Sequence, residues 1–178
     1  MTTKLPPTSG TDALPSAAAT ASTAAHTPLV AGVAQAVPLK YAKEIQGIAS
    51  CPGSLPAPRD MVGFRFVFAN IDNPKNFQPV ALLQPQRVLK NGTPVTDCCS
   101  AYALSMFSSL EAMRQKVGIA SESSRLLMKR IGDHFAQVEI RAPNGLCGVP
   151  DRRGHFDFFE RSTFDGIAAT ITRGRIPL

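Results

Sequence analysis

The stretch Phe64-Arg65-Phe66-Val67-Phe68 decides the fold class, because its phenylalanines alternate with other residues. This period of two places the aromatic rings on one side of an extended chain and Arg65 on the other, which is typical of a half-buried strand. Ala136, Val138 and Ile140 repeat the same alternation further along the chain. The sequence therefore predicts a sheet whose strands lie near both ends of the folded part.

Several other segments fit strands of the same sheet. These are residues 80–83, which 87–90 extend toward the turn at Asn91-Gly92, residues 155–160, and a last strand that contains Ile167, Ala169 and Ile171. Helix signals occupy the middle of the chain. They predict helices over residues 97–107 with Asp97 as the cap, 110–117 with Ser108 or Ser109 as the cap, and 121–131. Grouped strands, then helices, then strands indicate an α+β fold with a mainly antiparallel sheet and two or three short helices inserted between its halves.

The domain organisation follows from a change in composition. Residues 1–38 are rich in Ala, Thr, Ser and Pro and carry only Lys4 and Asp12 as charges. Such a segment buries too little apolar surface to offset its ordering entropy, so we predict a disordered leader. Residues 39–58 are predicted to hold a short helix and a Pro-rich linker, and residues 59–178 a single α+β domain.

The leader lacks the continuous apolar stretch of a secretory signal peptide, and the first arginine of the chain is Arg59, unlike in organelle transit peptides. Its Ser/Thr/Ala/Pro composition resembles the N-terminal export region of bacterial type III secretion substrates. That resemblance implies a protein that is cytoplasmic or exported by a route other than the classical secretory one. A plain flexible tether explains the composition equally simply.

Composition excludes several classes of protein. No apolar run reaches the ~18 residues of a membrane span, and phosphate-loop, dinucleotide-binding and zinc-protease motifs are missing. We therefore predict no cofactor. With only four cysteines (51, 98, 99 and 147) in 178 residues, the chain is expected to be reduced and intracellular.

One constellation suggests nucleophilic catalysis. Cys98 and Cys99 open a predicted helix, where the helix dipole favours thiolate, and His134 or His155 each begin a predicted strand and can act as the base. Asp157 shares a strand face with His155 and can orient it. The pair Asp97-Cys98-Cys99-Ser100 and Gly132-Asp133-His134 resembles the motifs of papain-like hydrolases of the NlpC and amidase type, which implies a cysteine hydrolase. The alternative is that both cysteines belong to the core.

The same cysteines and histidines have donor types that suit zinc, but vicinal cysteines and the absent two-residue spacing argue against a metal site. The formal net charge of +6 and three local basic clusters favour a different partner, nucleic acid. The clusters are Arg152-Arg153, Arg173-Gly174-Arg175 and Lys129-Arg130, and the four arginines 152, 153, 173 and 175 are the candidate nucleic-acid-binding residues. Dispersed arginines also form ordinary solvated faces.

Three functions follow in order of preference. The first is a small macromolecule-binding protein with a flexible leader, a candidate bacterial effector or toxin-system component whose partner is another protein. The second is a thiol hydrolase that uses Cys98 or Cys99 with His134 or His155. The third is a basic nucleic-acid-binding module. Whether the chain is an enzyme is left open by the sequence.

Overall fold

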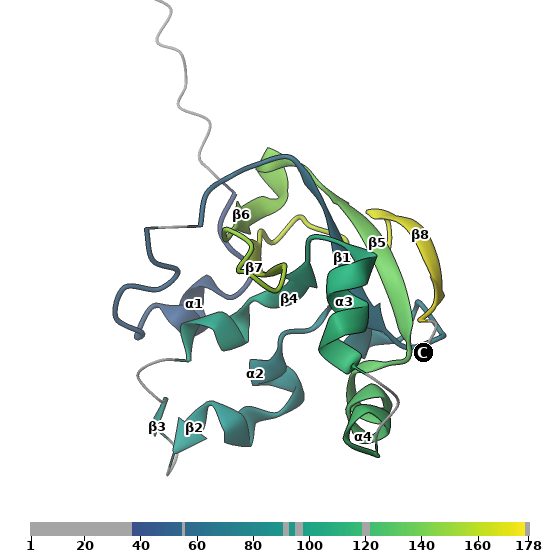
Figure 1. Ribbon diagram of the computed structural model, residues 1–178. Helices are drawn as coiled ribbons and strands as arrows, with labels where there is room; N and C mark the ends of the chain where they lie inside the picture. The colour runs from purple at the N-terminus through teal and green to yellow at the C-terminus, as the bar shows by residue number, and fades with distance from the viewer. Residues whose placement is uncertain (1–36, 55, 91–92, 95–97, 119–121, 177–178) are drawn as a thin grey trace, which may run out of the picture. The chain divides into compact units, whose positions relative to one another are not determined.

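The computed structural model describes residues 37–54, 56–90, 93–94, 98–118 and 122–176. Its main element is an antiparallel sheet of six strands in the order β6-β7-β4-β1-β5-β8 (Figure 1). The strands are β1 (Met61–Val67), β4 (Leu104–Phe107), β5 (His134–Ile140), β6 (Gly145–Cys147), β7 (His155–Glu160) and β8 (Thr170–Arg175). A separate two-stranded ladder pairs β2 (Leu89–Lys90) with β3 (Thr93–Pro94).

The helices are short and lie between strands in the sequence. They are α1 (Ala42–Ile45), α2 (Val80–Leu83), α3 (Leu110–Val117) and α4 (Glu122–Ile131), with 3-10 turns η1 (Pro74–Phe77), η2 (Pro85–Arg87), η3 (Cys99–Tyr102) and η4 (Ala142–Asn144). The predicted α+β class with a mainly antiparallel sheet is confirmed. The predicted leader, residues 1–38, lies outside the described residues except for Val37 and Pro38.

Alternation along the strands gives the sheet two different apolar faces. One face holds a cluster that includes Val67, Met106, Val138 and Phe158, all nearly inaccessible to solvent. Gly63 is required there, because a Cβ atom at its position would approach the Met106 side chain to 2.7 Å. The side chains around Gly63 therefore pack closely on this side.

Helix α3 covers the other face, beside β1 and β4 (Figure 1). Ser109 caps the helix by accepting a hydrogen bond from the Ala112 amide at 3.1 Å, and Gly118 ends it with a φ of 66°, as the sequence predicts. Met113 and Val117 are buried against Phe107 of β4 in the second cluster. The third predicted helix is also present as α4.

Two predicted elements are wrong in type. Residues 80–83, expected to be a strand, form helix α2, because Pro79 begins a turn that Gln84 closes by donating its amide to the Val80 carbonyl. Residues 97–107 were expected to be one helix, but the described part, 98–107, contains the turn η3 followed by strand β4. In β4, Leu104 and Met106 alternate with the exposed Ser105, and this period of two is that of a strand.

The ends of the chain also differ in part from expectation. The last strand begins at Thr170 rather than near Ile167, because Asp165 accepts hydrogen bonds from the Ile167 and Ala168 amides and holds them in a turn. At the other end, the short helix predicted within residues 39–58 is the single turn α1. The proposed cap Asp97 lies outside the described residues.

Residues 37–57, which we call the arm, pack against the domain. Ile45 and Ile48 are buried in a third cluster with residues of α2 and η3. The amide and carbonyl of Ala57 pair with Cys147 at the free side of β6. Cys51 forms a disulfide with Cys99, so the expectation that the cysteines are reduced is wrong for this pair. Cys98 and Cys147 are free and buried.

None of the described helices combines the length and apolar character needed to cross a membrane.

Candidate functional site

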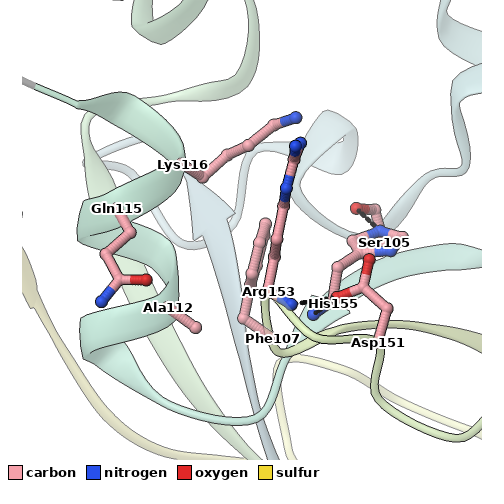
Figure 2. A pocket seen from close by; sticks show the side chains of 8 residues that line it. All are labelled: Ser105, Phe107, Ala112, Gln115, Lys116, Asp151, Arg153 and His155. Carbon is pink, nitrogen blue, oxygen red and sulfur yellow. Dashed lines mark hydrogen bonds between the residues drawn. The ribbon is translucent and has the colours of Figure 1, made fainter.

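Strands β4 and β7 bring together a serine and a histidine on the face that α3 covers. Register pairs Ser105 with Asp157 and Phe107 with His155, and directly opposed residues of an antiparallel pair point to the same side. Ser105 Oγ lies 2.7 Å from His155 Nε2, within hydrogen-bonding distance (Figure 2). This is the distance at which an imidazole can take a hydroxyl proton.

Two contacts position His155: its ring packs against Phe107, and its backbone amide is hydrogen-bonded to Asp151. Its centroid lies 5.4 Å from that of Phe107, in an edge-to-face arrangement. The turn that precedes β7 is organised by Asp151, whose Oδ1 accepts hydrogen bonds from the amides of Arg153 at 2.8 Å and His155 at 2.9 Å. Both hydrogen bonds lower the pKa of the Asp151 carboxyl, and the bond from the His155 amide has the larger effect.

Gly154 completes this turn with a φ of 73°, a conformation that residues with a Cβ atom rarely adopt. A Cβ atom there would also lie 2.7 Å from both Ala112 Cβ and Ser108 Oγ. The turn therefore sits tightly against the start of α3. This contact fixes the distance between the helix and His155.

Arg65 supports Ser105 from β1. Strands β1 and β4 are paired at Phe64 and Phe107. The guanidinium of Arg65, the next residue of β1, donates a hydrogen bond to the Ser105 carbonyl of β4 at 2.9 Å. The same group donates to the carbonyls of Asn76 at 2.6 Å and Gln78 at 2.8 Å. Burial lowers the pKa of Arg65 to about 10, so it remains charged at neutral pH.

A cavity of about 500 Å³ opens over the serine and histidine. It is lined by Ser105, Phe107, Ala112, Gln115, Lys116, Asp151, Arg153 and His155 (Figure 2). Figure 2 shows Lys116 rising from α3 and Arg153 from the turn, with their charged ends toward the same side of the cavity. Two cations, Lys116 and Arg153, stand against one carboxylate, Asp151, so the net charge of this lining favours anions.

Two more cavities reach the same histidine. One of about 310 Å³ contains Arg87, Cys98 and Ser105 as well as His155 and Asp157. The other, of about 610 Å³, lies between the arm and β7. Ser105 and His155 therefore stand where several openings in the surface meet.

Asp157 is a second acidic group of this site, beside Asp151. Burial raises the pKa of its carboxyl, while the electrostatic influence of His155 lowers it. Asp157 stands opposite Ser105 in the ladder and two residues from His155, on the same face of β7. As a carboxylate it would stabilise a protonated imidazole.

The structure separates most of the other predicted site residues. Cys99 is bonded to Cys51 and has no thiol to serve as a nucleophile. Cys98 is only 6% exposed and lines the smaller cavity near His155. His134 begins β5, two strands away from β4 in the sheet, and its Nδ1 lies 2.7 Å from Asp133 Oδ1.

The four arginines predicted to bind nucleic acid do not form one cluster. Arg152 and Arg153 lie in the turn before β7, and only Arg153 lines the first cavity. Arg173 and Arg175 lie on β8, at the opposite end of the sheet from the β6–β7 pair. A nucleic acid would have to cross the whole sheet to contact both groups.

Sequence reasoning identified His155 and Asp157 but missed Ser105 and Arg65 as site residues. The alternation of Leu104, Ser105 and Met106 was the available signal for Ser105. For Arg65 the signal was a charge in an otherwise apolar strand. The described residues include no group of three His, Cys, Asp or Glu side chains placed to hold a metal ion.

Comparison of the chain with protein-family models, with curated proteins and with solved structures finds no match. Function must therefore be argued from the geometry of the site.

Proposed function

We propose that the protein is a hydrolase that cleaves esters of anionic substrates, with Ser105 as the nucleophile and His155 as the general base. The observation that carries this proposal is the 2.7 Å distance between Ser105 Oγ and His155 Nε2 inside an open cavity. A nucleophile and a base within hydrogen-bonding reach are the signature of covalent catalysis. His155 is one of the two histidines that the sequence offered as the base, and in this proposal a serine takes the place of the expected cysteine.

The preference for an anion rests on the charged lining. Lys116 and Arg153 extend over the cavity, and the Asp151 Oδ1 oxygen already accepts two backbone hydrogen bonds. A carboxylate or phosphate group on the substrate would bind these two cations. The same cations would also stabilise the negative charge that develops on the reacting oxygen.

The reaction proceeds in two balanced steps. Ser105 Oγ attacks the acyl carbon as His155 Nε2 takes the hydroxyl proton, and the imidazolium then gives this proton to the leaving alkoxide. Water next attacks the acyl-serine, His155 accepts a proton from the water, and the proton returns to Ser105 as the acid leaves. The carboxylate of Asp157 stabilises the imidazolium in both steps.

A serine-directed fluorophosphonate tests the nucleophile, because attack by Ser105 Oγ expels fluoride and leaves a phosphonyl group on the oxygen. We expect mass spectrometry to place this group on Ser105, and Ser105→Ala or His155→Asn to lower labelling at least about 100-fold. The matched controls are Ser162→Ala and His134→Asn, which change the same residue types away from the cavity. Labelling of Ser105→Ala at the wild-type rate would refute the proposal.

Hydrolysis of 4-nitrophenyl hemisuccinate against 4-nitrophenyl butyrate tests the preference for an anion. Arg153→Gln is expected to lower kcat/KM for the hemisuccinate about tenfold more than for the butyrate, because it removes one charged hydrogen bond. Arg152→Gln, the neighbouring arginine outside the cavity, should leave the ratio unchanged. Equal effects of the two substitutions would show that the cavity does not select for charge.

The other two hypotheses from the sequence stay predictions. Binding of another protein requires no catalytic group. Binding of nucleic acid would make affinity fall steeply with salt, because condensed counterions are released. Neither has a specific contact in the described residues that favours it over the serine–histidine site.

A further inference from the structure

We propose that the cavity between the arm and β7 is a second subsite, which binds an uncharged apolar group on the other side of the scissile ester. This inference rests on the proposed function, because it assigns the two halves of the substrate to two sides of His155. It adds a substrate class: esters that join a carboxylate- or phosphate-bearing part to an apolar part.

The first argument is continuity with the reactive pair. This cavity of about 610 Å³ shares Asp151, His155 and Asp157 with the openings on the other side of the site. Its remaining lining consists of small, apolar and uncharged side chains. They are Ser50, Pro52, Gly53, Ser54, Pro56, Cys99, Ser100, Gly148, Val149, Phe156 and Phe159. A group bound here lies next to the imidazole that protonates the leaving oxygen.

The second argument is the asymmetry of charge. The described residues that line the arm-side cavity include the carboxyl groups of Asp151 and Asp157 and no lysine or arginine. The cavity on the α3 side shares the Asp151 carboxyl but adds two cations, Lys116 and Arg153, so its lysine, arginine and carboxylate side chains sum to one net positive charge. An anionic group is therefore drawn to the α3 side and repelled from the arm side. This difference sets a single direction for the substrate across His155.

The third argument is an exposed apolar side chain without an evident role in the core. Val149 has 61% of its surface exposed and stands in the lining of this cavity. Pro52 and Pro56 of the arm line the same cavity and have rigid apolar rings. An alkyl or aromatic group could pack against these three side chains. Its binding would be stabilised because apolar surface of both the group and the side chains is removed from water.

The fourth argument is that the arm wall is fixed to the domain at several points. The disulfide joins Cys51 to Cys99, and the backbone of Ala57 pairs with Cys147. Nearer the start of the arm, Lys40 Nζ lies 3.0 Å from the buried Glu160 carboxylate. A wall held in place loses little conformational entropy when a ligand binds.

The experiment measures equilibrium binding to full-length Ser105→Ala protein, so that turnover does not interfere. The probes are monomethyl succinate and monobenzyl succinate, which share the anionic half and differ only in the apolar half. We expect the benzyl ester to bind about tenfold more tightly, since its ring enters the arm-side cavity. Val149→Ser in the same background should reduce this ratio to about threefold, and Cys51→Ser should reduce it by freeing the wall.

The matched control is Ile171→Ser, which replaces another exposed β-branched residue, on β8, and should leave the ratio unchanged. Equal affinities for the two esters, or a ratio that Val149→Ser does not alter, would refute the subsite. If the benzyl preference is present but wild-type protein hydrolyses neither ester, the subsite stands and the proposed hydrolase function fails. If wild-type protein hydrolyses both esters without a benzyl preference in binding, only the subsite fails.

Discussion

Replacing Arg65 by methionine tests whether a buried cation holds β4 in place. The guanidinium donates to three backbone carbonyls, of which that of Asn76 is in a buried bond and those of Ser105 and Gln78 are in partly buried ones. Methionine has a similar length and no donor. All three acceptors would lose their charged partner, and the Glu160 carboxylate would lose a positive charge whose field acts on it.

The size of the effect follows from those contacts. An unsatisfied buried acceptor costs about 1–3 kcal/mol, with the smaller value for groups that water can reach. One buried and two partly buried carbonyls give about 5 kcal/mol, and release of the guanidinium from its desolvated site offsets part of this. We therefore expect Arg65→Met to lower the free energy of unfolding by about 3–5 kcal/mol, out of a typical total of about 5–15 kcal/mol.

Urea denaturation followed by circular dichroism measures this loss. The control is Arg141→Met, because Arg141 is 68% exposed in its ion pair with Glu139 and should contribute less than about 1 kcal/mol. Arg65→Lys retains the charge but loses the forked donor, so it should lower the free energy of unfolding by less than Arg65→Met does. It also provides a measurable value if Arg65→Met does not fold. A loss below about 1 kcal/mol for Arg65→Met, at an unchanged m-value, would refute this reasoning.

Three further predictions concern stability. Burial raises the pKa of Glu160, so over the pH range between its unfolded and folded pKa values the native state retains a proton that the unfolded chain releases. Stability therefore falls as pH rises through that range. Glu160→Gln should make the urea midpoint less dependent on pH when it is measured from about pH 4 to about pH 8. Reduction of Cys51–Cys99, which spans 48 residues, should lower stability by about 2–4 kcal/mol, and Cys51→Ser should make the protein insensitive to the reductant in the same titration. Gly154→Ala should cost about 1–3 kcal/mol of unfolding free energy through its positive φ, whereas Gly47→Ala, with open space around it, should be nearly neutral in thermal melts.

The elements that the sequence predicts correctly are those whose pattern is local and long. Strand β5 alternates strictly from Ala136 to Ile140, and helix α3 has both a serine cap and a glycine stop. Strand β4 was misassigned because four residues give only two periods of alternation. Its neighbours in the sheet, β1 and β7, supply the hydrogen bonds that make it a strand, and they are distant in sequence.

The sequence predicted His155 and Asp157 of the candidate site but not Ser105, for the same reason. His155 and Asp157 lie two residues apart on one strand, so periodicity alone places them on one face. The partner of His155 depends on the register between β4 and β7, which brings Ser105 across 50 residues of chain. The disulfide between Cys51 and Cys99 is likewise set by the packing of the arm, which no spacing of cysteines reveals.

The two sides of the sheet differ in how their edges are covered. At one side, Ala57 of the arm occupies the hydrogen-bonding positions of β6. At the other side β8 is the last strand of the order, and a strand in this position can recruit a strand from another molecule. Arg173 and Arg175 are both exposed on β8. Arg175 Nε also lies 3.5 Å from Asp133 Oδ2, whereas none of the described ion pairs involves Arg173. We expect the like charges at these two positions to oppose antiparallel pairing with a second β8, which would disfavour edge-to-edge aggregation.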